Sequence, residues 1–325
     1  MTDESLATLD ALANAALALW DLPSDARARR INVSENVTYL VQGGGTKAVL
    51  RLHRPAYHTR RAIECELAWA NAVREAGAVR TPRALTGKDG ATVQVAGGPG
   101  VSRFAVLFEF VDGTAPDESQ DLTGNFNQLG AIAARLHQHS RSWSRPQPFE
   151  RLRWDADTVF GPNATWGDWR DAPNVTDQIA AVLEPVQDLI CRRLAAFGQE
   201  PDRFGLIHAD MRLANLLIDT AGTVVIDFDD CGFGWFLYDF AAAISFIEDH
   251  PQVPALRTAW IAGYRQIQPL SDADVAELDT FVMLRRMALL AWIGSHIEAP
   301  EPQAMAPHFA QGTAVLGQAY LDRMG

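Results

Sequence analysis

Cysteine is scarce in this chain of 325 residues. The three cysteines, Cys65, Cys191 and Cys231, are far apart, and none belongs to a C-x-x-C pair. A disulfide framework and a cysteine zinc site both need paired or regularly spaced cysteines. The sequence therefore predicts neither, and a reducing cytoplasm is the expected compartment.

Long apolar stretches and basic clusters are also missing. The longest apolar runs, such as residues 240–247, fall far short of the ~20 residues that a membrane-spanning helix needs. No lysine or arginine precedes Arg27, so the N-terminal region does not resemble a signal peptide. The formal net charge is −12, whereas nucleic-acid binders gain much of their affinity from basic residues that neutralise phosphates. We expect a cytoplasmic protein with neither a membrane nor a nucleic acid as partner, and the oligomeric state stays open.

Apolar residues are plentiful enough for a sizeable core, since they make up 48% of the chain. Their pattern changes near Asp112, because β-rich runs dominate before it and helical patterns after it. We therefore predict an α+β fold with two lobes, residues 1–111 and 112–325. The glycines at 43–45 lie between two β-rich runs and favour a hairpin turn over a phosphate-binding loop, which would need a following Gly-Lys-Ser/Thr and a helix.

Each lobe has its own set of expected elements. The first lobe is expected to contain helices at residues 6–20 and 58–75 and strands at 37–42, 47–52, 92–95 and 103–110. The second lobe is expected to contain helices at 122–139, 175–197, 238–247, 255–265, 274–293 and 305–324, a β-rich island at 205–228, and a long irregular connection at 144–173.

The β-rich island carries the polar residues of most interest. A strand, a turn at Ala221-Gly222 and a second strand would bring Asp210, Asn215 and Asp227 together. Phosphoryl transfer needs such a set, because one carboxylate accepts the proton of the attacking hydroxyl while hard oxygen ligands hold magnesium. Magnesium is usually bound by one or two carboxylates together with phosphate oxygens and water.

The spacing within the island is that of a known motif. His208-x-Asp210-x-x-x-x-Asn215 matches the catalytic loop of kinases, and Asp227 lies where their metal-binding Asp follows. Together with the run Ile226-Asp227-Phe228-Asp229, the motif resembles the aminoglycoside phosphotransferase superfamily, which includes choline kinases, type II homoserine kinases and bacterial stress-response kinases. The resemblance extends from about residue 32 to residue 293 and implies a two-lobed, protein-kinase-like fold that uses ATP and Mg²⁺.

The resemblance also implies roles for single residues of the second lobe. Asp210 would be the catalytic base, and Asn215 and Asp227 would bind magnesium. Asp229 would assist with a second metal ion, with a solvated charge as the alternative. His208 would organise the loop without carrying a proton.

Asp239 resembles the family's aspartate that holds the catalytic loop through backbone contacts. It could equally cap the helix that follows it, and the two roles can coexist. In the first lobe, Ser34 and Asn36 lie in a segment similar to the turn that covers the nucleotide, with an ordinary strand-to-strand turn as the alternative.

Arg51 occupies the position of the usual phosphate-anchoring lysine and is not equivalent to it, because a guanidinium binds phosphate bidentately. Its carboxylate partner should be Glu66, which flanks the apolar stripe of the helix, in preference to Glu64. Glu109 and Val111 lie in the segment similar to the hinge that binds adenine through its backbone.

The expected function is transfer of the γ-phosphoryl group of ATP to a hydroxyl of a small molecule, such as an amino alcohol, homoserine or an aminoglycoside. The alternatives are a stress-response-type Ser/Thr protein kinase, a catalytically silent nucleotide-binding relative, and a metal-dependent hydrolase. The last is disfavoured because a catalytic zinc site commonly needs several histidines and only His208 is near.

Aromatic residues are concentrated on the expected acceptor side of the second lobe. They are Trp154, Trp166, Trp169, Tyr238 and Trp292. They could surround an ammonium group by cation–π contact, or they could belong to the core.

Overall fold

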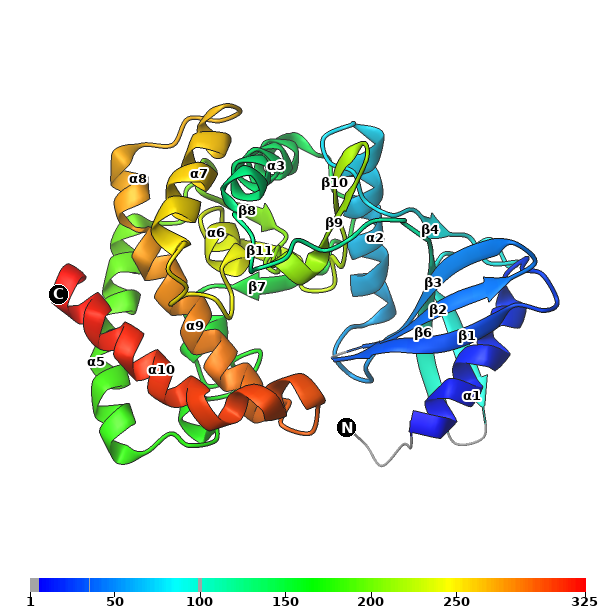
Figure 1. Cartoon of the computed structure of the whole chain (residues 1–325), viewed down its shortest axis with the longest axis horizontal. Coiled ribbons are helices and arrows are strands. Elements are labelled where there is room, and N and C mark those ends of the chain that lie inside the picture. Colours follow the sequence, from blue (N-terminus) through cyan, green and yellow to red (C-terminus); the bar gives the residue numbers. More distant parts are fainter. Residues whose placement is uncertain (1–5, 35, 99–100) are drawn as a thin grey trace.

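The computed structural model describes residues 6–34, 36–98 and 101–325 and has two lobes (Figure 1). An antiparallel sheet forms the smaller lobe, and helices form most of the larger one (Figure 1). The predicted α+β, two-lobed architecture is therefore confirmed.

The sheet of the small lobe has the strand order β1-β2-β3-β6-β4, with β5 also paired to β6, and every pairing is antiparallel. Its strands are β1 (Arg27–Val33), β2 (Val37–Gly43), β3 (Thr46–Leu52), β4 (Ala84–Leu85), β5 (Gln94–Gly98) and β6 (Val101–Glu109). Gly44 and Gly45 form the predicted hairpin turn with φ angles of 52° and 78°. Strand β1 was not predicted from the sequence, because it is an edge strand without a fully buried residue and carries three arginines.

Each face of the sheet is covered by one helix. Helix α1 (Leu6–Ala16) shares a hydrophobic cluster with Leu50 and Leu107. Helix α2 (Arg60–Glu75) packs on the opposite face, where its Ile63 meets Val106. The other side of α2 belongs to the core of the large lobe, so this helix lies between the two lobes (Figure 1).

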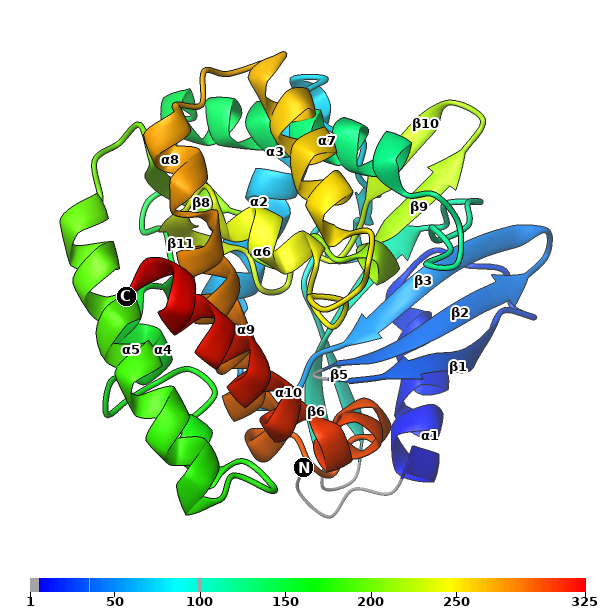
Figure 2. The ribbon, with the colours of Figure 1, turned by 60° about the vertical axis from the view of Figure 1, so that its left-hand side comes forward.

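The large lobe is built mostly of helices, and the sequence predicted most of them with differences at their ends. The helices are α3 (Thr123–Ser142), α4 (Ala156–Phe160), α5 (Asp177–Phe197), α6 (Tyr238–Ala243), α7 (Val253–Arg265), α8 (Asp272–Ala276), α9 (Leu278–Ser295) and α10 (Pro300–Met324). The short helix α4 was not predicted, and the single helix expected at 274–293 is divided into two at Glu277. Figure 2 shows α5, α9 and α10 gathered on one side of this lobe, and all three are in mutual contact. Helix α6 stops earlier than predicted, before a left-handed residue at Phe246, and α10 starts earlier because proline suits the first helical turn.

Short strands carry the polar residues of the β-rich island. Strands β9 (Leu216–Asp219) and β10 (Gly222–Val225) form an antiparallel hairpin. Strands β7 (Leu152–Trp154), β11 (Gly232–Trp235) and β8 (Phe204–Ile207) form a second small sheet in that order. Strand β7 and helix α4 lie inside the connection that the sequence suggested was irregular. The chain between β8 and β9 contains the predicted catalytic loop.

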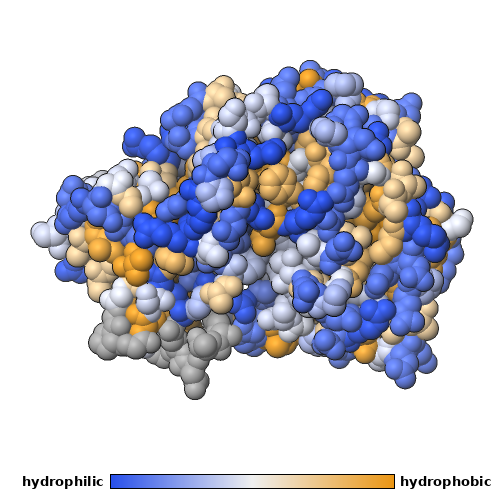
Figure 3. Space-filling model, turned by 180° about the vertical axis from the view of Figure 1, so that it is seen from behind, coloured by the Kyte–Doolittle hydropathy of each residue, from blue (hydrophilic) through white to orange (hydrophobic). Residues whose placement is uncertain are grey.

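The face of the molecule seen from behind in Figure 3 is mostly hydrophilic, with smaller hydrophobic patches between the polar residues. Within the part of the chain that the structure describes, no helix combines the length and the apolar character that crossing a membrane requires.

Two glycines allow helices α3 and α7 to touch. A Cβ atom added at Gly130 would lie 2.0 Å from the carbonyl oxygen of Trp260, and one added at Gly263 would lie 1.8 Å from that of Asn127. We expect Gly130→Ala to force the two helices apart and to lower the free energy of unfolding by about 1–3 kcal/mol, as overpacking does. Denaturant unfolding measures this loss.

Gly124→Ala is the matched control, because it lies on the same helix and an added Cβ there meets no atom within 4 Å. It should leave stability unchanged or slightly improved. Equal unfolding midpoints for the two variants would contradict the proposed crossing constraint.

Candidate active site

A cavity of about 690 Å³ lies between the two lobes. The residues that line this cavity include all the predicted site residues except His208 and Asp239. The predicted residues that line it are Ser34, Asn36, Arg51, Glu66, Glu109, Val111, Asp210, Asn215, Asp227 and Asp229.

The catalytic loop contains an unusual backbone conformation. Ala209 is completely buried and has a φ of 66°, in the left-handed region that is unfavourable for a residue with a Cβ. The buried carboxylate of Asp239, at the start of α6, accepts hydrogen bonds from the backbone N–H groups of His208 at 3.3 Å and Ala209 at 2.8 Å. It also accepts one from Nε2 of His137 at 2.8 Å. Asp239 therefore holds the loop through its backbone.

His208 connects the backbone of the catalytic loop to the backbone just before Asp227. Its Nδ1 accepts a hydrogen bond from the backbone N–H of Asp210 at 3.2 Å, so its Nε2 carries the proton that is donated to the carbonyl of Ile226 at 3.2 Å. Burial lowers the pKa of His208, which favours the neutral ring that these two contacts require. This geometry suits a residue that organises the loop.

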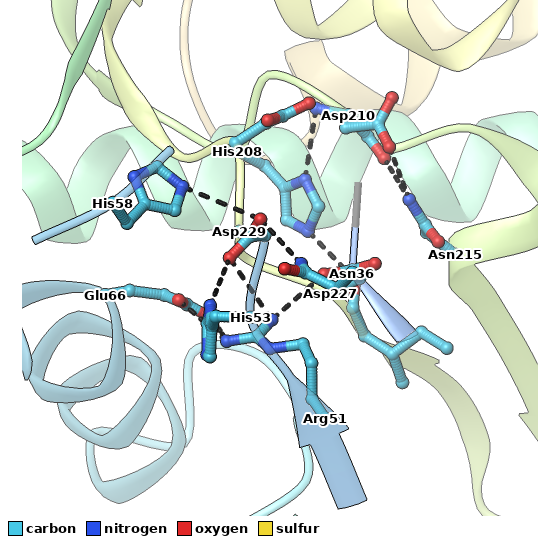
Figure 4. A network of polar contacts seen from close by, with 12 residues as sticks. Asn36, Arg51, His53, His58, Glu66, His208, Asp210, Asn215, Asp227 and Asp229 are labelled. Atoms are coloured by element: carbon cyan, nitrogen blue, oxygen red, sulfur yellow. Dashed lines mark hydrogen bonds and ion pairs between the residues drawn. The ribbon is translucent and has the colours of Figure 1, made fainter. Parts of the chain in front are cut away.

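Asp210 and Asn215 face each other across the loop (Figure 4). The side-chain amide nitrogen of Asn215 donates to Oδ2 of Asp210 at 2.7 Å and to its backbone carbonyl at 2.9 Å. Oδ1 of Asp210 accepts a hydrogen bond from Nη2 of Arg285 at 2.6 Å. Since the amide nitrogen of Asn215 faces Asp210, its oxygen is directed elsewhere.

Arg51 connects the small lobe to the segment that the sequence predicts to bind a metal ion. Its Nη2 lies 2.6 Å and 2.8 Å from the two carboxylate oxygens of Glu66, and its Nη1 lies 3.1 Å from Oδ1 of Asp227. Arg51 and Glu66 are both buried, whereas the side chain of Asp227 is 45% exposed. The expected pairing of Arg51 with Glu66 is present, while Glu64 lies on the exposed side of α2.

Asp229 points into a group of small-lobe side chains (Figure 4). Asn36 donates a hydrogen bond to Oδ2 at 2.8 Å, and the rings of His53 and His58 lie 3.5 Å and 3.6 Å from the carboxylate. Arg51 Nη1 is 3.7 Å away. Burial alone would raise the pKa of Asp229, but Arg51 and the two imidazoles outweigh it and hold this pKa well below its usual range. The carboxylate therefore already has several polar neighbours.

The expected covering turn and hinge also face the cavity. The backbone N–H of Ser34 donates to the carbonyl of Asn36 at 2.9 Å, which closes the turn between β1 and β2. Glu35 lies outside the described residues. Glu109 ends β6 and Val111 follows two residues later, and both line the cavity. The Glu109 side chain accepts a hydrogen bond from the backbone N–H of Arg83 at 3.0 Å.

Several residues of the site were not identified from the sequence. They are His53, His58, His137, Arg285, and Arg151, whose guanidinium donates a hydrogen bond to the backbone carbonyl of Asp229. Each comes from an element remote in sequence from the catalytic loop, so no local motif reveals it. For Arg285 a signal existed, because Arg285-Arg286 interrupts an otherwise apolar run at residues 281–293.

Comparison with known proteins agrees with this geometry. A sequence model described as the phosphotransferase enzyme family (APH) matches residues 27–277. The chain belongs to this family. Over 277 residues it is 24% identical to an amicoumacin kinase of Bacillus subtilis, a match that spans 82% of this chain and 79% of that protein.

Solved structures extend the similarity to nearly the whole chain. A microcompartment-associated aminopropanol kinase is 44% identical, with a TM-score of 0.89, and the match covers 96% of this chain and 97% of that one. An amicoumacin kinase solved with AMP-PNP, Ca²⁺ and Ami has the same fold, with a TM-score of 0.76 at 21% identity over 94% of this chain and 92% of that one. The protein is an ATP-dependent kinase that phosphorylates a hydroxyl group of a small molecule.

The Arg51–Glu66 contact gives a test of the small-lobe side of the site. Arg51→Met and Glu66→Met each leave a buried charge without its main partner, and we expect the double variant to lose less stability than the sum of the two. The coupling energy should be about 0.5–3 kcal/mol, measured by denaturant unfolding in a double-mutant cycle.

Glu64→Met serves as the control, because the Glu64 side chain on the same helix is 37% exposed. Its effect should stay within about 0.5 kcal/mol. Additive losses for Arg51 and Glu66 would show that the pair does not act as a unit.

Proposed function

We propose that the protein transfers the γ-phosphoryl group of ATP to the hydroxyl group of an amino alcohol of the aminopropanol type. The observation that carries this proposal is the similarity to an aminopropanol kinase, which extends over almost the full length of both chains. The cavity of about 690 Å³ that Asp210 lines must also hold the nucleotide, which favours a compact acceptor.

Asp210 is the proposed catalytic base. Its carboxylate lies at the cavity wall and is held from two sides by Asn215 and Arg285, so its remaining lone pairs can accept the proton of an acceptor hydroxyl. His208 and Asp239 stabilise the conformation of the catalytic loop by accepting hydrogen bonds from its backbone N–H groups. In phosphoryl transfer most of the rate gain comes from positioning and electrostatic stabilisation, which fits a site of fixed side chains.

Magnesium is the proposed metal ion, held by the side-chain oxygen of Asn215 and the half-exposed carboxylate of Asp227. Both are hard oxygen donors on the cavity wall, and two protein ligands suffice where phosphate oxygens and water complete the shell. When bound, the ion would neutralise charge on the phosphates. For Asp229 we propose a connecting role between the lobes, since its carboxylate already contacts Asn36, His53 and His58.

The small lobe, proposed as residues 1–111, would cover ATP and leave residues 112–325 to hold the catalytic loop and the acceptor. Arg51 would contact the phosphates while Glu66 fixes its orientation. Ser34 and Asn36 would approach the phosphates through the turn between β1 and β2. Backbone groups near Glu109 and Val111 would meet the adenine ring, because they lie on the wall of the same cavity.

An acceptor screen tests the proposal directly. ATP consumption should be stimulated most by short amino alcohols, and much less by choline, homoserine, an aminoglycoside or a generic protein substrate. Asp210→Ala should reduce turnover roughly 10²–10⁴-fold, the usual effect of losing a general base. Stimulation by the protein substrate alone would favour a protein kinase and overturn the proposal.

Calorimetric titration tests the metal assignment. Asp227→Ala should weaken the binding of ATP in the presence of Mg²⁺ by about tenfold or more, because a carboxylate ligand is lost. Binding of ATP in the presence of a chelator should be similar in the variant and the original protein. An unchanged affinity for Mg-ATP would remove Asp227 from the metal site.

A further inference from the structure

Arg285 is a buried cation that touches the proposed catalytic base. It lies on α9, a helix that is buried on nearly all sides, and is itself only 2% exposed. Its Nη2 donates a hydrogen bond to Oδ1 of Asp210 at 2.6 Å, and its Nε donates to the hydroxyl of Ser245 at 3.1 Å. Two separate contacts therefore fix the plane of the guanidinium.

Aromatic rings enclose the same guanidinium. Its central carbon lies 5.4 Å from the ring centre of Trp166 and 5.8 Å from that of Tyr238. Trp154 packs against both, at 4.8 Å from Trp166 and 6.1 Å from Tyr238. All three rings are buried. We call Trp154, Trp166 and Tyr238 the aromatic box.

The aromatic box therefore already contains a cation that belongs to the chain. From the sequence, these rings were candidates for holding the ammonium group of an acceptor. Trp169 and Trp292, the other two candidates, make different contacts, with Gln187 and with Phe246 respectively. Arg285 therefore occupies the place beside Trp166 and Tyr238 that an acceptor ammonium group would need for cation–π contact with these two rings.

Arg285 remains positively charged although it is buried. Burial alone would lower the pKa of Arg285, but Tyr238 and Asp210 outweigh it and hold this pKa above its usual range. A buried guanidinium needs such partners, since a buried charge left unpaired is strongly destabilising. Cation–π contact with two rings adds to the stabilisation.

A second arginine near Asp210 is held less tightly. Nε of Arg212 lies 3.6 Å from Oδ2 of Asp210, and its Nη1 is paired with Glu301 at 2.8 Å. Arg212 is partly exposed, whereas Arg285 is enclosed. Arg285 therefore makes the shorter and more rigid of the two contacts with the carboxylate.

We propose that Arg285, held in the aromatic box, is the positioning residue that fixes the orientation of the Asp210 carboxylate toward the acceptor hydroxyl. The inference rests on the proposed role of Asp210 as the base. Arg285 occupies Oδ1 and Asn215 occupies one side of Oδ2, so a single rotamer of Asp210 meets both partners. An error of about 1 Å in the position of a reacting group can cost 10²-fold in rate.

A double-mutant cycle on turnover tests this role. Arg285→Ala should lower kcat by roughly 10–10²-fold and leave KM for ATP within about twofold, because positioning of Asp210 is lost while the nucleotide contacts remain. In an Asp210→Asn background the same change should lower the residual kcat by less than about twofold, since residues that act as a unit are not additive. Millimolar guanidinium added to Arg285→Ala should restore part of kcat by refilling the box.

Arg285→Lys and Arg286→Lys form a matched pair for the case in which the alanine variant fails to fold. Both arginines lie on α9 and are buried, but Arg286 pairs with Glu248 at 2.7 Å. Arg286→Lys should keep kcat close to that of the original protein. Arg285→Lys should lower it, because a compact ammonium on a flexible stem does not reproduce the rigid, planar geometry with which the guanidinium contacts Ser245 and Asp210.

The outcomes separate this inference from the proposed function. Unchanged kcat in Arg285→Ala, or an equal loss in the Asp210→Asn background, would overturn the positioning role while leaving Asp210 as the base. Full activity of Asp210→Asn would overturn the proposed base, and with it the basis for assigning Arg285.

Discussion

The site depends on one constraint, the left-handed backbone at Ala209 that Asp239 holds in place. A buried alanine in this conformation costs about 1–2 kcal/mol. Two backbone N–H groups donating to a carboxylate offset that cost, because hydrogen bonds to a charged group are stronger than neutral ones. Asp239 is itself held by His137 on α3, whose ring lies 3.0 Å from the hydroxyl of Tyr264 on α7. The packing of α3 against α7 is thus connected to the catalytic loop through His137 and Asp239.

Contacts between arginine and carboxylate groups also connect the two lobes. Arg51 from β3 contacts Glu66 of α2 with one nitrogen and Asp227 of the large lobe with the other. A guanidinium has five N–H donors and can serve two carboxylates at once, whereas a single ammonium is a point charge. Arg51 therefore lies at the position expected for the phosphate anchor and also connects the two lobes. Asp229 adds a second link through Asn36, so the position of the small lobe is coupled to the segment that would bind the metal.

The parts of the molecule that the sequence predicted are those that local patterns encode. The catalytic loop has fixed spacing, and most helices have an apolar stripe, so both can be placed from the sequence alone. Strand β1 was not predicted because an exposed edge strand without a buried face shows no alternation of apolar and polar residues. His137 and Arg285 escaped because their partners, Asp239 and Asp210, are distant in sequence, and a single chain records no such pairing. The preference for Glu66 over Glu64 succeeded because it rested on helical geometry.

Burial of a charge is not by itself a sign of function, and α9 provides the contrast. Arg285 and Arg286 are neighbours and both are buried, yet they face different groups because consecutive helical residues point about 100° apart. Arg286 turns toward Glu248 and the Phe309 ring of α10, 3.5 Å from its guanidinium carbon, which joins two helices of the core. Arg285 turns toward a carboxylate that lines the cavity. The partner therefore distinguishes them: one arginine stabilises packing between helices, whereas the other acts on the geometry of the proposed base.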